Sequence, residues 1–365
     1  VAPLVGDPLV VHFVQVLLEA VHRVGHGEAL HEEVHLRELA HAVVQDDLVG
    51  PHGCDQQVQI GQFIPVDDAE LLETERAQQC FEGMKAQTAP DGRILLFRPD
   101  LNAQRMGRTA ERLLMPHVPE EMFVRAVRDT VRANASWVPP YGSGASLYIR
   151  PMLIGVGENL GLKPAQSYEF RVFVSPVGPY YKTAGLGTIK LAVSEMDRAA
   201  PSGTGSYKAG ANYAGGLLAT KRAQELGANE ALYLDSRERR FIDEAGSANI
   251  VVVMRDGTVV TPKSDAILPS ITRRSIMTLA EKKLGLVTEE RPIELRKEIV
   301  NFSEAAACGT AAVLSPVGSI WFDGDWHDVG NPEHVGPVMQ QLYDLLVGIQ
   351  KGEADDEFGW TVDVA

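Results

Sequence analysis

The sequence predicts an α/β (α+β) protein of two domains, and three observations support this fold class. Segments with the apolar pattern of strands recur between segments with the spacing of amphipathic helices. A chain of 365 residues, 45% of them hydrophobic, has enough apolar material for two cores. A turn-rich stretch at 176–187 lies between the two halves and is the expected linker.

Local patterns predict the elements of the first half. In 101–115, apolar residues recur at helical spacing after a turn that begins at Pro99. The strand RILLF (93–97) precedes that turn. The predicted strands are 93–97, 146–155 and 169–177, and the predicted helices are 101–115 and 120–136.

The second half alternates more regularly. The dipeptide Asp256-Gly257 between two valine-rich runs predicts a hairpin over 249–262. Gly227 and Gly285 each follow an amphipathic segment, where glycine commonly ends a helix. The further strands are expected at 188–195, 231–235, 240–246 and in a pair over 305–318, and the helices at 213–227, 272–285 and 332–352.

The domain boundaries follow from these elements and from a change in composition. We expect a small α/β domain at 77–174, an interdomain linker at 175–187 and a large domain at 188–365. Residues 1–76 form a separate, anomalous segment. No internal repeat is present.

Composition limits the classes of function. The formal net charge of −15 argues against nucleic-acid binding, which requires a basic surface. Three cysteines fit a reducing compartment rather than a disulfide framework. No run of 18 apolar residues predicts a membrane span, and the first residues lack a basic signal region. We therefore expect a cytoplasmic protein.

The segment 1–76 differs from the rest of the chain. It contains 14 acidic and 3 basic residues and seven of the ten histidines, but no Ser, Lys, Asn or Tyr. Residues 9–24 could form a helix or two strands, and 28–44 are typical of a helix. Two interpretations stay open: a divergent extension, or an out-of-frame or opposite-strand translation, which the composition favours. We expect that this segment does not supply the small-domain strands that would precede Phe81, and that it packs poorly against 77–174.

A short motif in this segment suggests a metal site. His31 and His35 stand in an H-E-x-x-H pattern, the helical zinc pair of metalloproteases. His41 falls at the third-ligand position of the longer motif, but Glu38 replaces the glycine that turns the chain there. On an unbroken helix His41 lies about 240° around the axis from His35. A zinc hydrolase is thus a remote alternative, and no metal is expected.

A glycine-rich stretch at 201–216 delivers one lysine, Lys208, among small residues. It lacks the Gly-Lys-Ser/Thr of a phosphate-binding P-loop. A desolvated lysine has a lowered pKa and can form a Schiff base with an aldehyde cofactor. Taken alone, the stretch fits a surface lysine on a flexible loop better.

Several further motifs follow one another in a fixed order along the chain, and together they span nearly four-fifths of it. Together they resemble the branched-chain amino acid aminotransferases, pyridoxal-phosphate enzymes of fold-type IV. The motifs are CFEGMKA (80–86), LFRPDLNAQRMGRTAERLLMP (96–116), SLYIRPMLIG (146–155), SGTGSYKAGANYA (202–214), IDEAGSANI (242–250), LPSITRRSI (268–276), ACGTAAVLSPV (307–317) and FGW (358–360). The resemblance implies a smaller N-terminal α/β domain, a larger C-terminal pseudo-barrel domain and pyridoxal 5′-phosphate as cofactor.

The resemblance also implies roles for single residues. Lys208 matches the Schiff-base lysine, which then moves a proton to and from the substrate Cα. Glu244 matches the carboxylate on the pyridine nitrogen, and Tyr213 matches the phenol on the ring oxygen. Further cofactor contacts are implied for Arg105, Ser247, Leu268, Ile271, Thr272 and Thr310. Of these, Ile271 and Thr272 open a helix whose amides suit a phosphate.

The substrate side of the family site is implied as well. An apolar wall and Arg150 would hold a branched side chain or the distal carboxylate of glutamate. The substrate-binding positions are Phe81, Tyr148, Arg150, Leu160, Leu162, Thr310 and Ala311. In the family, the loop that corresponds to Leu160 and Leu162 comes from a neighbouring subunit, which implies a homodimer.

The expected reaction moves the amino group of leucine, isoleucine or valine to 2-oxoglutarate. The alternatives within the fold are a D-amino-acid aminotransferase and an aminodeoxychorismate lyase, and a non-catalytic binding protein is a third class. The chain departs from the family before Phe81, where Glu75-Arg76 stands in place of the usual His-Tyr. One pocket wall is therefore in doubt.

Overall fold

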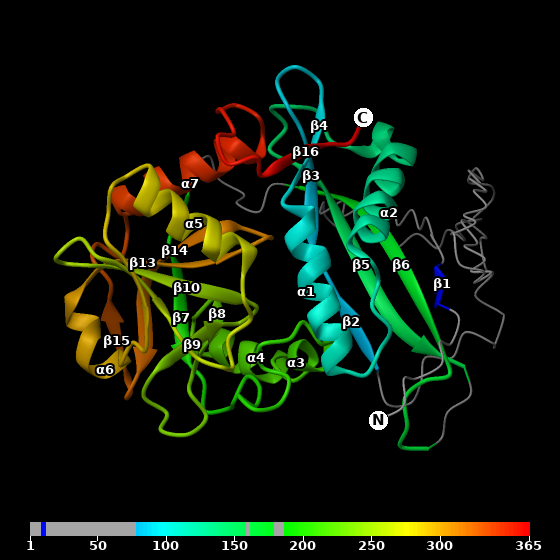
Figure 1. Cartoon of the computed structure of the whole chain (residues 1–365). Coiled ribbons are helices and arrows are strands. Elements are labelled where there is room, and N and C mark those ends of the chain that lie inside the picture. The colour runs from blue at the N-terminus through cyan, green and yellow to red at the C-terminus, as the bar shows by residue number, and fades with distance from the viewer. Residues whose placement is uncertain (1–8, 12–77, 158–160, 179–185) are drawn as a thin grey trace, which may run out of the picture.

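The computed structural model describes residues 9–11, 78–157, 161–178 and 186–365. Two mixed sheets lie on either side of helix α1 (Pro99–Arg112), as Figure 1 shows. Strands and helices alternate along the chain, which confirms the predicted fold class.

The first sheet is built around one long hairpin. In it β5 (Ser146–Val156) and β6 (Ser167–Val177) pair antiparallel along their full lengths. The path of this sheet runs β1-β6-β5-β3-β4-β16, and β2 pairs with β5 outside the path. The other strands are β1 (Leu9–Val11), β2 (Gln79–Phe81), β3 (Met84–Thr88), β4 (Ile94–Phe97) and β16 (Thr361–Asp363).

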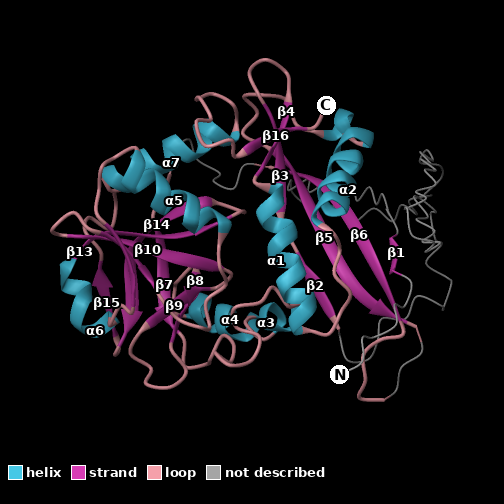
Figure 2. Ribbon diagram, in the orientation of Figure 1, coloured by secondary structure: helices cyan, strands magenta, loops and turns pink. Residues whose placement is uncertain are grey.

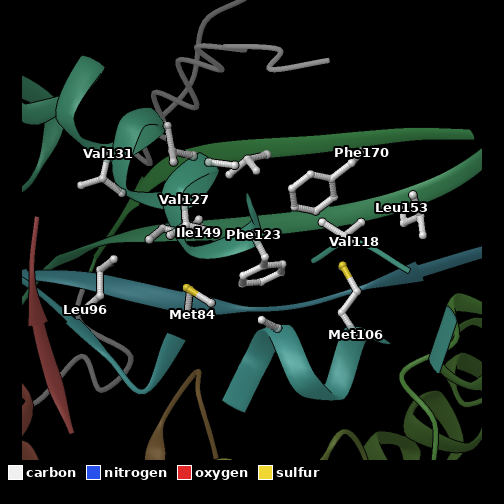
Figure 3. Packing of buried hydrophobic residues seen from close by; sticks show 14 of the residues in the cluster. Met84, Leu96, Met106, Val118, Phe123, Val127, Val131, Ile149, Leu153 and Phe170 are labelled. Atoms are coloured by element: carbon white, nitrogen blue, oxygen red, sulfur yellow. The ribbon is translucent and has the colours of Figure 1, made fainter. Parts of the chain in front are cut away.

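The first core lies between this sheet and two helices. Helix α1 and helix α2 (Glu120–Ala133) place Met106 and Phe123 in the core, and both side chains are almost fully buried. Figure 3 shows these side chains with residues of the sheet such as Met84 and Phe170. The opposite face of α1 carries buried polar residues, and these position the site described below.

The second sheet closes on itself. Its path runs β12-β11-β10-β13-β14-β7-β8-β9, and β9 also pairs with β10, so that six strands from β10 to β9 form a ring. This ring corresponds to the expected pseudo-barrel. The strands are β7 (Ile189–Val193), β8 (Glu230–Leu234), β9 (Ile242–Ala245), β10 (Ala248–Met254), β11 (Val259–Pro262), β12 (Thr288–Arg291), β13 (Phe302–Gly309), β14 (Val313–Phe322) and β15 (Asp325–Asp328), of which β15 pairs with β14.

Helices cover the ring from outside, as Figure 2 shows. Helix α5 (Ile271–Lys282) and helix α7 (Pro337–Gln350) pack against each other and against the ring through a shared apolar cluster. A proline stands at the start of both α1 and α7, where its missing N–H and fixed φ are tolerated. Helix α7 therefore begins at Pro337, later than the predicted residue 332. The short helix α6 (Leu295–Glu298) lies beyond α5 in the chain.

The helix predicted over 213–227 is two helices. Helix α3 (Gly210–Ala214) ends at the Gly215-Gly216 pair, and α4 (Leu217–Glu225) follows it. Glycine inside a helix costs about 0.5–1 kcal/mol relative to alanine, so the pair is a natural break. A Cβ at Gly216 would lie 3.1 Å from the hydroxyl of Tyr233, which makes a close approach to β8 a second reason for glycine.

The structure describes only three of residues 1–76, and the strand that they form does not lie next to Phe81. Leu9–Val11 pair in parallel with Tyr168–Phe170 of β6, at the edge of the first sheet rather than beside β2. The other expectations for 1–76 lie outside the described residues, including the helix at 28–44 and the packing against 77–174. Part of the predicted linker lies outside them too, so the domain boundaries remain a prediction.

The segment after α7 returns to the first sheet and makes contacts that connect the two sheets. Strand β16 pairs antiparallel with β4, and the backbone N–H of Arg98 donates to Trp360 O at 2.7 Å. The buried Trp360 ring stacks on Phe358 and meets Phe97 edge-on. The Arg98 guanidinium lies over the same ring, 4.8 Å from its centroid, and also donates to Ser275 of α5 at 2.8 Å.

We expect Trp360→Ala to lower the free energy of unfolding by about 3–5 kcal/mol, because a large buried ring is lost from the contact between the sheets. Denaturant unfolding followed by circular dichroism measures this. The matched control is Trp137→Ala, since Trp137 is 38% exposed. Equal losses in the two variants would contradict the assigned role of Trp360.

Candidate active site

Lys208 lies at the end of the glycine-rich stretch, just before α3. Its Nζ donates to Tyr213 Oη at 2.8 Å, and the amine also lies 4.7 Å from the centroid of the Phe81 ring. The rings of Phe81 and Tyr213 meet edge to face at 4.8 Å between centroids. The lysine amine is thus held between two aromatic rings, one from β2 of the first sheet and one from helix α3.

The backbone around Lys208 is fixed by the first sheet and by α1. The Phe81 N–H donates to Lys208 O at 3.2 Å, and Cys80 forms an antiparallel bridge with Ala209. The Lys208 N–H donates to Thr109 Oγ1 of α1 at 3.1 Å. These contacts anchor the lysine segment to the sheet that carries the substrate-side residues.

The electrostatic surroundings favour the neutral form of the lysine amine. Burial lowers the pKa of Lys208 to about 7, and the positive charges of Arg105 and Arg150 act in the same direction. The negative charges of Glu82 and Glu244 oppose this shift. An amine with such a pKa is substantially unprotonated at neutral pH, which is the reactive form of a nucleophile.

Glu244 is a buried carboxylate on β9. Its Oε1 accepts from Asn249 Nδ2 at 2.6 Å and from the Leu268 N–H at 3.0 Å, and its Oε2 lies 2.5 Å from Arg198 Nε. Burial raises the pKa of Glu244 to about 7, while Arg198 and the Leu268 N–H act to lower it. Leu268, predicted as a cofactor contact, therefore contacts the carboxylate through its backbone.

Arg105 on α1 forms a two-point ion pair that the sequence did not reveal. Its Nε and Nη2 each donate to the Glu82 carboxylate at 2.7 Å, and Asn102 Nδ2 also donates to Glu82 at 2.7 Å. The Glu82 side chain is fully buried. Arg105 Nη1 donates to Pro269 O at 3.1 Å, just before α5. The arginine thus joins α1 to the segment that leads into that helix.

The beginning of α5 carries two of the residues predicted to contact the phosphate, Ile271 and Thr272. Ser270 caps the helix by accepting from the Arg273 N–H at 3.1 Å, so serine at this position performs a capping role. The first N–H groups of a helix have no partner within it, which suits an anion. A small cleft is lined by Ile271 and Thr272 of α5, together with Thr310 and Gly83.

The substrate-side residues predicted on β2 and β5 lie together. Arg150 Nη2 donates to Tyr148 Oη at 2.8 Å, and its guanidinium lies 4.6 Å from the Phe81 ring centroid. Arg150 Nε is buried without a hydrogen-bond partner. A Cβ at Gly83 would lie 2.4 Å from Tyr148 Oη, so only glycine leaves room for this hydroxyl.

The turn between β13 and β14 closes the site from the second sheet. Thr310 Oγ1 donates to Gly83 O at 3.2 Å. Ala311 O accepts from Lys85 Nζ at 2.6 Å, and burial lowers the pKa of Lys85 to about 8. Lys85 was not singled out from the sequence, although it lies within the CFEGMKA motif.

Two predicted residues are not brought into this cluster. Leu162 is 92% exposed and lines no part of the site within one chain. Ser247 is an exposed residue of the turn between β9 and β10. Leu160 lies outside the described residues. Arg112 on α1 is exposed and donates to the carbonyls of Gly203 and Ser202 at 3.0 and 3.2 Å.

A second, larger cavity of about 690 Å³ lies between α4 and the strands β7 and β14, and none of the predicted site residues lines it. In the part of the chain that the structure describes, no group of three or more His, Cys, Asp or Glu side chains could hold a metal ion. His31 and His35 lie outside that part. No helix within it is long and apolar enough to cross a membrane.

Comparison with known proteins agrees with this geometry. The family model described as amino-transferase class IV matches residues 79–320. A solved branched-chain amino acid aminotransferase from Thermobaculum terrenum, in its pyridoxal-phosphate form, has a TM-score of 0.70 and 26% identity, covering 83% of this chain and 95% of that one. The Escherichia coli enzyme of the same name has a TM-score of 0.68 and 29% identity, covering 83% and 97%.

The fold, the lysine and the matched family model define a class IV aminotransferase. The branched-chain-amino-acid aminotransferase of Haemophilus influenzae is 49% identical over 79% of this chain and 84% of its own length. The Helicobacter pylori protein of that name is 47% identical over the same shares. Within its class, the chain therefore belongs to the branched-chain-amino-acid aminotransferase family.

The lowered pKa of Lys208 predicts that this amine reacts with acylating reagents at a lower pH than an ordinary lysine does. In the cofactor-free protein, we expect acylation of Lys208 to rise with pH around 7, and peptide mass spectrometry measures it. The exposed Lys221 on α4 is the comparison within the same sample. Labelling of both lysines with the same pH dependence would contradict the electrostatic description of the site.

Glu82→Gln should lower the free energy of unfolding by about 3–5 kcal/mol, because it leaves the Arg105 charge buried without its counter-charge. Denaturant unfolding measures the change. Asp91→Asn is the matched control, since Asp91 pairs with Arg93 on the surface and should unfold close to wild type. A Glu82 variant as stable as this control would show that the pair is not required.

Proposed function

We propose that this protein transfers the amino group of leucine, isoleucine or valine to 2-oxoglutarate with pyridoxal 5′-phosphate as cofactor. One observation carries the proposal: a lysine amine of lowered pKa lies against Tyr213 and within electrostatic reach of the buried Glu244. The names of relatives that are 49% and 47% identical support the substrate class.

The residues present fit the cofactor in their chemistry. Lys208 offers a neutral amine for the aldehyde, and Glu244 offers a buried carboxylate for the ring nitrogen. Thr272 and Thr310 line one cleft at the beginning of α5, which suits the phosphate group. When bound, pyridoxal phosphate supplies an electron sink for the carbanion formed at the substrate Cα.

The catalytic work of the chain then divides among a few side chains. Lys208 would attach the cofactor and would carry the proton that leaves and returns to the substrate Cα. Tyr213 holds the lysine amine and donates to the ring oxygen of the cofactor. Glu244 keeps the ring nitrogen protonated. Arg105 adds a positive charge on the phosphate side, with two of its five N–H groups left after Glu82 and Pro269 are served.

On the substrate side, Phe81 and Tyr148 would form the apolar wall for a branched side chain. Arg150 would take the distal carboxylate of glutamate, since its buried Nε has no hydrogen-bond partner among the described residues. The turn of Thr310 and Ala311 would take the α-carboxylate through its amides. Ser247 is proposed as a hydroxyl near the cofactor, although its side chain is exposed.

We propose that the functional unit is a homodimer. Leu162 projects into solvent at 92% exposure, and in a dimer this loop, with Leu160, would cover the site of the partner subunit. The proposed domains are 77–174 and 188–365, joined by 175–187, and the proposed location is the cytoplasm. A D-amino-acid aminotransferase and an aminodeoxychorismate lyase remain the alternatives within the fold.

Turnover assays separate these activities. Purified protein with added pyridoxal phosphate is supplied with 2-oxoglutarate and either leucine or D-alanine, and with aminodeoxychorismate in a third sample. Glutamate formation from leucine alone supports the proposal. Turnover of D-alanine or of aminodeoxychorismate in its place would assign the corresponding alternative activity.

Lys208→Ala should abolish transamination of leucine without loss of the fold, because it removes the amine that is proposed to attach the cofactor. Borohydride reduction of the wild-type holoenzyme should fix the cofactor on the peptide that contains Lys208, as mass spectrometry detects. Lys221→Ala serves as the control. Residual turnover by Lys208→Ala near the wild-type rate would contradict the assignment.

A further inference from the structure

Arg198 is a buried arginine in the loop after β7, and it contacts Glu244. Its side chain is 5% exposed and that of Glu244 is 3% exposed. Its Nε lies 2.5 Å from Glu244 Oε2, but this N–H makes no aligned hydrogen bond, so the contact is between charges. Arg198 is thus the direct counter-charge of Glu244.

The other end of Arg198 joins two segments of the site. Its Nη2 donates to Gly205 O and to Ala266 O, both at 2.5 Å. Gly205 precedes Lys208 by three residues, and Ala266 precedes Leu268 by two. A Cβ at Gly205 would lie 2.7 Å from Ala266 Cα, so the two segments touch at this point. One guanidinium therefore connects the carboxylate, the lysine loop and the segment that donates to Glu244.

We propose that Arg198 is a positioning residue that keeps Glu244 ionised against the ring nitrogen of the cofactor. The proposal rests on the proposed function, because it needs pyridoxal phosphate beside Glu244. A buried carboxylate next to a pyridine nitrogen can share its proton in two ways, as an ion pair or as a neutral acid with a neutral ring. Low polarity favours the neutral pair, whereas an adjacent guanidinium favours the ionised pair.

The other groups around Glu244 cannot replace this charge. Asp243, its neighbour on β9, raises the pKa of Glu244, and Lys208 lowers it less than Arg198 does. Asn249 is a neutral donor, as is the Leu268 N–H. Arg198 is therefore the one permanent positive charge in contact with Glu244 among the described residues.

The test uses the holoenzyme with pyridoxal phosphate labelled with ¹⁵N in its ring, because the nitrogen chemical shift separates a protonated from a neutral ring. The wild type should show a protonated ring at pH 7. Arg198→Met should show a neutral ring. Its turnover of leucine should be slower by about tenfold or more, the free-energy equivalent of a shift of one pKa unit or more. Arg198→Lys, which keeps the charge, should retain the protonated ring.

A matched control removes similar hydrogen bonds to the lysine loop but leaves the positive charge next to Glu244 in place. Arg112→Met loses two donations to the Ser202 and Gly203 carbonyls of the same lysine loop. Its ring nitrogen should stay protonated. A neutral ring in Arg112→Met as well would mean that loop order alone sets the shift, and the proposal would fail.

A second measurement tests whether Arg198 acts through Glu244. In a Glu244→Gln background no carboxylate remains to be ionised, so adding Arg198→Met should change leucine turnover by no more than about twofold. A loss of leucine turnover in this background as large as in the wild-type background would overturn the proposal. If Arg198→Met fails to fold, a neutral ring in the wild type or in Arg198→Lys overturns it instead.

These outcomes are distinct from failure of the proposed function. A wild-type protein that binds no pyridoxal phosphate, and so has no visible absorbance, overturns both. A wild type that binds the cofactor but does not turn over leucine overturns the substrate assignment, while the nitrogen shift still decides the role of Arg198. An active wild type with a protonated ring in Arg198→Met overturns the Arg198 proposal alone.

Discussion

The site depends on charges that are buried in compensating pairs. Arg105 with Glu82 and Arg198 with Glu244 are both nearly inaccessible to solvent. Burying a single charge is costly, and a partner with good geometry offsets that cost. Because each pair joins separate segments, the requirement for neutrality also fixes the relative positions of α1, β2, β9 and the lysine loop. The reactive amine of Lys208 is held inside this frame.

The sequence was sufficient for the residues that carry distinctive chemistry in a distinctive setting. Lys208 stood out as a candidate because of its glycine-rich surroundings, and the family resemblance identified Glu244. The residues that support them were missed for a physical reason. Thr109 and Arg198 are ordinary polar residues in sequence, and only the three-dimensional fold reveals that Lys208 and Glu244 are their partners.

Local pattern predicted most strands and helices, and it failed where tertiary packing or backbone chemistry decided. The Gly215-Gly216 break inside an apolar period and the later start of α7 at Pro337 are local effects. The parallel pairing of Leu9–Val11 with β6 had no local signal, since composition gave no register. The ring closure between β9 and β10 is similarly a long-range property, although the resemblance to a known family anticipated a barrel.

The pairing of β16 with β4 has a consequence for how the chain folds during synthesis. Phe97 and Thr361 are paired in the sheet but lie on opposite sides of the second sheet in sequence. The ribosome must therefore release nearly all of the second sheet before the edge of the first can be covered. Until then β4 exposes unpaired backbone groups, the kind of edge that recruits other strands. The nascent chain is thus most vulnerable to aggregation in this interval, and chaperone binding would be most useful then.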